Sequence, residues 1–152
     1  MSSALPRPDL TARPHGLTVE RLMKAAPEAV YRAWTAEFDS WFADPGMVRM
    51  RPAVGEPYVF LTRHQSQVHP HYGRFLALEP HRLVELTWVT GAGGTEGAET
   101  VVTVELAPSP EGGTRLRLTH SGFNDLNAAT NHEEAWDQHV LPHLDDVLAA
   151  RP

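Results

Sequence analysis

A chain of 152 residues, of which 41% are hydrophobic and 21% charged, has the size and composition of one globular domain with a substantial core. The net charge of −6, without any basic run, argues against a general affinity for nucleic acid or anionic membranes. The absence of cysteine excludes disulfides, thiolate metal sites and a cysteine nucleophile. Because no long apolar run marks a membrane span or a signal peptide, we expect a cytoplasmic protein without membrane insertion.

The first third of the chain predicts an arm, a strand and two short helices. Residues 1–15 are rich in proline and arginine and lack periodicity, so we expect a flexible N-terminal arm followed by a single domain at 16–152. Residues 17–23 alternate weakly between apolar and polar side chains, which predicts a first strand. Pro27 suits the first position of a short helix, and we expect a second short helical piece over 37–42.

The middle of the chain predicts strands joined by short turns. Apolar and polar side chains alternate most cleanly in the last strand, where Leu116, Leu118 and His120 share one face. The glycine-rich stretch 91–97 predicts a mobile hairpin connection, and because it opens no helix it lacks the geometry of a phosphate-binding loop. The expected strands are 47–51, 56–63, 69–78, 82–89, 100–106 and 114–120.

The longest helical pattern lies at the C-terminus, over 131–150, with Asn131 as the expected N-cap. A sheet with one apolar face needs a cover, and no other stretch offers so long an apolar stripe. We therefore predict an α+β domain in which an antiparallel sheet is covered by this helix, with a ligand-sized cavity between them. The stripe consists of Trp136, Val140, Leu144, Val147 and Leu148.

Two acidic residues and one histidine stand out beside this stripe. Helical projection places Glu133 and Asp137 within the apolar sector, facing the sheet or the mouth of the cavity. The alternative is that they are carboxylates near the helix start, favoured by the helix dipole and open to water. Strand parity places His120 inward, either as a hydrogen-bonded core histidine or as a polar handle for a ligand or a general acid–base.

The remaining histidines give no strong metal signal. His139 and His143 are four residues apart on the helix, which is the spacing of a two-histidine metal pair. They lack an HExxH context and Pro142 lies between them, so we expect solvated histidines, no metal site and no cofactor. Pro142 also removes a backbone hydrogen bond and predicts a kink. The histidines of 69–71 are likewise expected at the solvated surface.

Aromatic residues recur through the predicted strands and helices. Such residues are most often core, but eight around one helix also fit a pocket for a flat or apolar ligand. Together with His120, Glu133, Asp137, Val140 and Leu144 they form the candidate ligand-binding set. The eight are Phe38, Trp41, Phe42, Tyr58, Phe60, Tyr72, Trp88 and Trp136.

Four segments of the chain are characteristic of a known superfamily. They read LTVERLMKAAPEAVYRAWTAEFDSWFADPG, YGRFLALEPHRLVELTW, GTRLRLTHSGF and AWDQHVLPHLDDVL. In these segments the sequence resembles the START-like, helix-grip (SRPBCC) superfamily, and within it the branch named after the activator of Hsp90 ATPase (AHSA1). The resemblance covers about residues 16–150. Its strongest pieces mark a fold and include no catalytic signature.

The resemblance implies a helix-grip fold in which a curved antiparallel sheet of six to seven strands grips the C-terminal helix around an apolar cavity, with two short helices after the first strand. Members bind hydrophobic molecules, a few perform cyclase chemistry in the cavity, and the Hsp90 activators act through protein contacts. We therefore expect a small hydrophobic or aromatic ligand in the cavity. The alternatives are a protein-interaction module with a filled cavity, and a cyclase- or hydrolase-like enzyme using His120 or Asp137 as a base. Either a monomer or a homodimer is compatible with the sequence.

Overall fold

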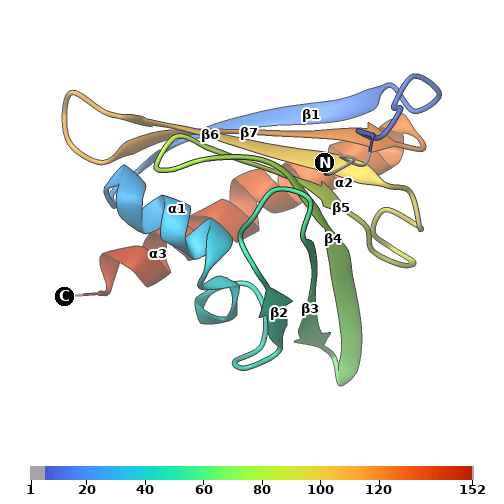
Figure 1. The fold of residues 1–152 in the computed structure, drawn as a ribbon, viewed down its shortest axis with the longest axis horizontal. Helices are drawn as coiled ribbons and strands as arrows, with labels where there is room; N and C mark the ends of the chain where they lie inside the picture. Colours follow the sequence, from blue (N-terminus) through green and yellow to red (C-terminus); the bar gives the residue numbers. More distant parts are fainter. Residues whose placement is uncertain (1–5, 152) are drawn as a thin grey trace, which may run out of the picture.

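The computed structural model describes residues 6–151, which form one seven-stranded antiparallel sheet with helices on its concave face (Figure 1). The strands lie in the order β1-β7-β6-β5-β4-β3-β2. Their bounds are β1 His15–Met23, β2 Val48–Met50, β3 Pro57–His64, β4 Gln67–Glu79, β5 Leu83–Trp88, β6 Thr100–Pro108 and β7 Thr114–Phe123. The helical elements are α1 Pro27–Thr35, the 3-10 turn η1 Phe38–Ser40, and a C-terminal helix made of α2 Leu126–Ala135, the π turn η2 Trp136–Val140 and α3 Leu141–Ala149.

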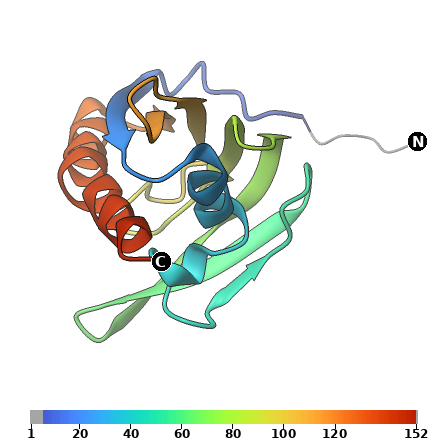
Figure 2. The same cartoon turned by 90° about the vertical axis from the view of Figure 1, so that its left-hand side faces the viewer.

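This arrangement confirms the predicted α+β class and the helix-grip architecture. Strands β2 to β6 each pair with the next strand in the chain, and β1 closes the order beside β7. Viewed end-on in Figure 2, the sheet curls from β1 and β7 round to β2 and β3, with the C-terminal helix along its open side. The second short helix expected at 37–42 is a single 3-10 turn.

The alternation in β6 and β7 shows which face of the sheet packs against the helices. Val102, Val104 and Leu118 are fully buried, because every second side chain points to the concave face. The opposite face carries polar pairs such as Glu20 and Arg117, whose charged atoms are 3.9 Å apart. The core therefore lies on the concave side, between the sheet and the helices.

A close approach at Gly73 bends the long strand β4 across β5. A Cβ atom at Gly73 would overlap the carbonyl and hydroxyl oxygens of Thr87. The same threonine accepts a hydrogen bond of 2.6 Å from the hydroxyl of Tyr58 and one of 2.9 Å from the backbone N–H of Arg74. Only glycine leaves room for this contact, so Gly73 sets the curvature that turns β3 and β4 towards the helix.

The C-terminal helix begins earlier than the sequence pattern indicated. Its N-cap is Asp125, whose carboxylate accepts a hydrogen bond of 2.7 Å from the backbone N–H of Ala128, and the expected cap Asn131 lies inside the helix. The first turn was missed because it has no apolar stripe: its one large apolar residue, Leu126, is exposed, and only Ala129 is buried in α2. For that reason the sequence pattern predicted a C-terminal helix shorter than the one in the structure.

A π turn interrupts the helix immediately before Pro142. The backbone N–H of Leu141 bonds to the carbonyl of Trp136, five residues back, and this inserts one extra residue into the turn. As a result Trp136 and Leu141 are both buried, although they are five residues apart. The proline thus lies next to a widened turn that relieves the clash its ring would cause in a regular α-helix.

A buried ion pair holds α3 against β1. The carboxylate of Asp145, with 3% of its side chain exposed, accepts hydrogen bonds from the guanidinium of Arg21 at 3.0 and 3.3 Å. Its second oxygen accepts one from the backbone N–H of Lys24 at 3.0 Å. Both oxygens are therefore satisfied, as a buried carboxylate requires.

The described part of the N-terminal arm contacts the sheet. The Arg13 guanidinium donates to the carbonyl oxygens of Gly122 at 2.8 Å and Glu99 at 2.6 Å, and Arg7 pairs with Glu85 at 2.7 Å. Residues 1–5 of the expected arm lie outside the described residues. Among the helices described within 6–151, none is long and apolar enough to span a bilayer.

Candidate functional site

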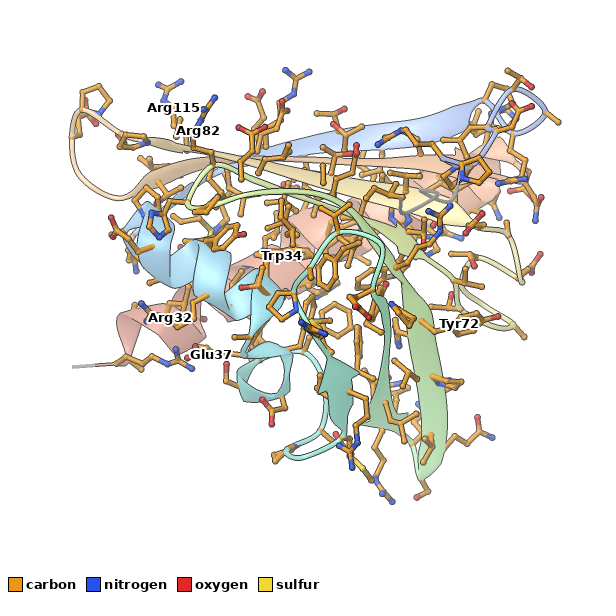
Figure 3. All side chains as sticks on the ribbon, in the orientation of Figure 1. Arg32, Trp34, Glu37, Tyr72, Arg82 and Arg115 are labelled. Atoms are coloured by element: carbon orange, nitrogen blue, oxygen red, sulfur yellow. The ribbon has the colours of Figure 1, made fainter. Side chains whose placement is uncertain are left out.

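Aromatic packing fills one end of the space between helix and sheet. Trp34 points from α1 into the interior (Figure 3), where its ring lies 5.6 Å from Phe38 and 5.1 Å from Trp41. Phe38 in turn stacks on Phe60 at 5.0 Å, and Phe60 on Tyr58 at 5.9 Å. All five side chains are buried. This end of the interior is a packed core.

The other end of the same space holds a cavity of about 360 Å³. That volume is in the range of small-molecule sites. Among residues 6–151, no aspartate, glutamate, lysine or arginine lines it. Its walls come from Phe42 in the segment after η1, from β3, β4 and β5, from the β5–β6 loop and from the C-terminal helix. The lining residues are Phe42, Thr62, His64, His69, Pro70, His71, Trp88, Thr90, Gly91, Ala92, Gly93, Gly94, His132, Ala135, Trp136 and Val140.

The residues expected to line a cavity divide into three groups. Phe42, Trp88, Trp136 and Val140 line it. Tyr72 does not, because it points away from the helices on the outer side of β4 and is 48% exposed (Figure 3). Its cross-strand partner Val59 is exposed as well, so the outward orientation follows from the register. The remaining candidates, Phe38, Trp41, Tyr58, Phe60 and Leu144, are buried core residues outside the cavity lining.

His120 is fully buried with both ring nitrogens engaged. The indole N–H of Trp136 donates to Nδ1 at 3.1 Å, so Nε2 carries the proton and donates to the Thr100 hydroxyl at 2.8 Å. That hydroxyl donates onward to the carbonyl oxygen of Trp88. Burial, and secondarily the nearby His132, lowers the pKa of His120 well below 6.5. A neutral ring with two partners orients Trp136 and offers no free nitrogen for proton transfer.

Glu133 and Asp137 are exposed, contrary to the orientation expected from helical projection. The projection assumed a constant helical period through the whole helix. The π turn shifts the phase by one residue, so the buried face of α2 runs through Ala129 and Trp136 instead. Both carboxylates are open to water, which is the alternative stated from the sequence.

His71 lies inside the protein, although the sequence pattern placed it at the solvated surface. Its ring stacks on Phe60 at 4.7 Å and 11°, with Phe42 and Trp88 edge-on at 5.4 Å each. Burial lowers the pKa of His71 to about 4, partly offset by a hydrogen bond to the His69 carbonyl and reinforced by the neighbouring histidines. His71 is therefore a neutral part of the cavity wall.

The glycine-rich loop forms the cavity rim. Two threonines close it: the N–H of Thr90 donates to the Thr95 hydroxyl oxygen at 2.9 Å, and the N–H of Thr95 donates to the Thr90 hydroxyl oxygen at 2.7 Å. A further bond of 2.9 Å joins the N–H of Gly97 to the carbonyl of Thr90. The sequence predicted a mobile loop here. These hydrogen bonds give the loop a defined internal structure.

Two further features lie at the surface. His139 and His143, weighed as a metal pair, are both exposed on the outer side of the helix. A second hollow, of about 450 Å³, lies on the convex face of the sheet, where Glu20, Arg115 and Arg117 contribute to its walls. Its mixed charges form cross-strand pairs, which is the ordinary character of a solvated sheet face.

Comparison with known proteins places this geometry in a family. The sequence model of the family described as "Activator of Hsp90 ATPase homolog 1-like protein" matches residues 24–149. The chain belongs to this family. The matched segment includes both the aromatic end of the interior and the cavity, since α1 and the C-terminal helix both lie within it. No curated protein is significantly similar to the chain.

Solved structures of bacterial proteins share the fold of this AHSA1-like chain. A Mesorhizobium loti protein is 26% identical with a TM-score of 0.74, covering 91% of this chain and 99% of its own. A Chromobacterium violaceum protein is 24% identical with a TM-score of 0.75, covering 91% and 100%. The Aha1 dimer from Colwellia psychrerythraea, solved in solution, is 22% identical with a TM-score of 0.68, covering 89% and 96%.

Sequence reasoning on this AHSA1-like chain missed cavity residues that had a readable signal. Phe75 is a buried residue of β4, and His71 lies four residues before it, on the same face by strand parity. Counting from Phe75 would have placed His71 inside and Tyr72 outside. His132 and Ala135 had no such signal, because their orientation depends on where the helix begins and on the π turn.

Proposed function

We propose that this protein binds a small hydrophobic or aromatic molecule in the cavity between the sheet and the C-terminal helix. The observation that carries the proposal is the cavity of about 360 Å³ with aromatic walls and, among the described residues, no aspartate, glutamate, lysine or arginine in its lining. Burying a flat apolar ligand there releases water from apolar surface without stranding a charge. Aromatic walls at Phe42, Trp88 and Trp136 suit ring stacking and edge contacts.

Native mass spectrometry on protein purified gently from its own host tests the proposal. A stoichiometric small-molecule adduct, extracted and identified, supports binding. Ala135→Phe places a ring inside the cavity and is expected to remove the adduct. Glu134→Phe is the matched control, because it places the same ring on the exposed face of the same helix and should keep the adduct. Equal adduct levels in the two variants would contradict binding in this cavity.

A second candidate function is protein contact through the outer face of β3 and β4. Val59, Val68 and Tyr72 expose 38%, 47% and 48% of their surface on this face, close to the edge of the sheet. The occupant with support is a second copy, because a protein of the same fold is described as a dimer. Light scattering over a concentration series tests this: a dimer mass lost in Tyr72→Ser supports it, and a monomer at every concentration contradicts it.

The geometry gives less support to catalysis by the residues considered for it. His120 has no free nitrogen, and Asp137 is exposed on the opposite side of the helix from the cavity. A general base must lie within hydrogen-bond reach of the proton that it removes. Ligand binding therefore accounts for the cavity with fewer requirements than turnover does.

A further inference from the structure

His71 is held rigidly in the cavity wall. Phe60 stacks against one face of its ring at 4.7 Å, while Phe42 and Trp88 close the sides with edge contacts at 5.4 Å. The side chain leaves β4 on the concave face, so the distal edge of the imidazole, with Nε2, extends away from the strand. Three aromatic neighbours thus fix the orientation of this ring before any ligand arrives.

The hydrogen bonds of His71 define which nitrogen is free. Nδ1 lies 3.3 Å from the backbone carbonyl oxygen of His69, and a carbonyl can only accept, so Nδ1 carries the proton. Nε2 is then an acceptor, and no residue within 6–151 hydrogen bonds to it. The depressed pKa keeps the ring neutral near pH 7. The titratable groups that share the cavity are His64 on β3, His69 on β4 and His132 on α2.

His132 repeats this pattern on the opposite wall. Its Nδ1 donates to the carbonyl oxygen of Ala128 at 2.8 Å, and its Nε2 has no hydrogen-bond partner among the described residues. Of the hydroxyls in the lining, Thr62 donates to the His69 carbonyl at 3.4 Å, and the Thr90 hydroxyl oxygen accepts from the N–H of Thr95 at 2.7 Å. The cavity therefore presents the Nε2 acceptor of His71 beside aromatic walls, and its lining contains no lysine or arginine among the described residues.

From this geometry we propose that the cavity selects a neutral, flat aromatic molecule whose hydroxyl or N–H group donates a hydrogen bond to Nε2 of His71. This inference rests on the proposed ligand-binding function and specifies its ligand class. A carboxylate ligand would lose its hydration without meeting a cation. An aromatic hydrocarbon would fill the space but leave the Nε2 acceptor buried without a partner.

Three probes of one size separate these possibilities in isothermal titration calorimetry at pH 7.5: 2-naphthol, 2-methylnaphthalene and 2-naphthoate. The expected result is that 2-naphthol binds about tenfold more tightly than 2-methylnaphthalene, as one net hydrogen bond allows. The expected affinity of 2-naphthoate is the weakest of the three. These compounds stand in for the chemical class and differ mainly in the group that would face His71.

The variant His71→Phe keeps a stacked ring and removes the acceptor. We expect it to lose the preference for 2-naphthol over 2-methylnaphthalene. His139→Phe changes an exposed histidine and should leave the preference intact. A melting curve shows that each variant is folded before titration.

The outcomes distinguish the two levels of the proposal. If all three probes bind the native protein equally, or if 2-naphthoate binds most tightly, the cavity binds ligands but donor selection by His71 is wrong. If 2-naphthol is preferred and His71→Phe keeps the preference, another group is the acceptor and the assignment to His71 is wrong. If no probe binds, the proposed function itself is contradicted for aromatic molecules of this size.

Discussion

At the scale of single residues, two histidines shielded from solvent, His120 fully and His71 in part, tie stability to pH. His71 and His120 are neutral in the fold, with pKa values below the ordinary 6.5, about 4 for His71. Between pH 6.5 and 4 the unfolded chain therefore binds more protons than the folded chain, and stability falls as pH falls. The sign is the opposite of that for a histidine stabilised by a carboxylate partner.

We predict that the free energy of unfolding is nearly constant above pH 7.5 and drops from pH 6.5 towards 4. His71 alone accounts for a loss of about 3 kcal/mol over this window, and His120 adds to it. Urea titrations of native protein, His71→Phe and His120→Gln measure the loss, which should shrink in both variants. His139→Gln, at an exposed position, should keep the native slope. A native slope in all three variants would contradict the assignment.

The buried carboxylate of Asp145 supplies a second residue-scale prediction. Arg21→Ala leaves this carboxylate with only the Lys24 N–H, so we expect a loss of about 2–3 kcal/mol in the free energy of unfolding. Glu20→Ala, next along β1 on the exposed face, should cost less than about 0.5 kcal/mol. Chemical denaturation measures both, and equal effects would mean that the Arg21–Asp145 pair contributes no net stability.

At the scale of elements, the curvature of β4 depends on one glycine. Gly73→Ala forces β4 and β5 apart at Thr87, and we expect a loss of about 2–4 kcal/mol in the free energy of unfolding. Gly91→Ala is the matched control, because a Cβ atom there meets no atom within 4 Å. Thermal unfolding compares the two. A Gly73→Ala protein as stable as the control would show that the strands adjust freely.

The π turn predicts an unusual tolerance to deletion. Removing Gln138 in a Pro142→Ala background converts the five-residue turn to an α turn while keeping Trp136 and Leu141 on the buried face. Removing Glu134 in the same background rotates α2 relative to α3 and takes Ala129 out of the core. We expect the first protein to melt close to the Pro142→Ala parent and the second to be strongly destabilised. Equal destabilisation would contradict the phase argument.

Sequence reasoning succeeded where one local rule determines the structure. Strands β5 to β7 each bury one face, so alternation alone located them and set the orientation of Leu116 and Leu118. The α+β class and the covering helix followed from the same patterns. The helix start and the phase of its two halves did not, because they depend on the Asp125 cap and on a π turn with no simple residue pattern.

For the candidate site the limit was different. The Phe and Trp residues of the lining, Phe42, Trp88 and Trp136, were all among the candidates, but alternation cannot tell a packed core from a cavity, since both need the same apolar side chains. Whether Phe38 or Phe42 faces open space depends on how Trp34, Trp41 and Phe60 fill the other end. Those distances are tertiary quantities that no single stretch of sequence contains.

At the scale of the whole molecule, the account rests on a division of one interior into a packed end and an open end. The packed end holds α1 against the sheet through Trp34 and Phe38, and the open end exposes Trp88 and Trp136 to a cavity. Such a division lets the fold remain stable while keeping space for a ligand, because the helix is anchored elsewhere by the Arg21–Asp145 pair.

The most direct test of ligand binding in the cavity is an NMR titration of the ¹⁵N-labelled protein with 2-naphthol. The account predicts saturable shifts in the indole N–H signals of Trp88 and Trp136 and in the amides of residues 91–94, all from cavity-lining residues. The amides around Arg115, in the hollow on the convex face, should remain unchanged. Shifts confined to that convex face, or no saturable shift at the cavity residues, would contradict the account.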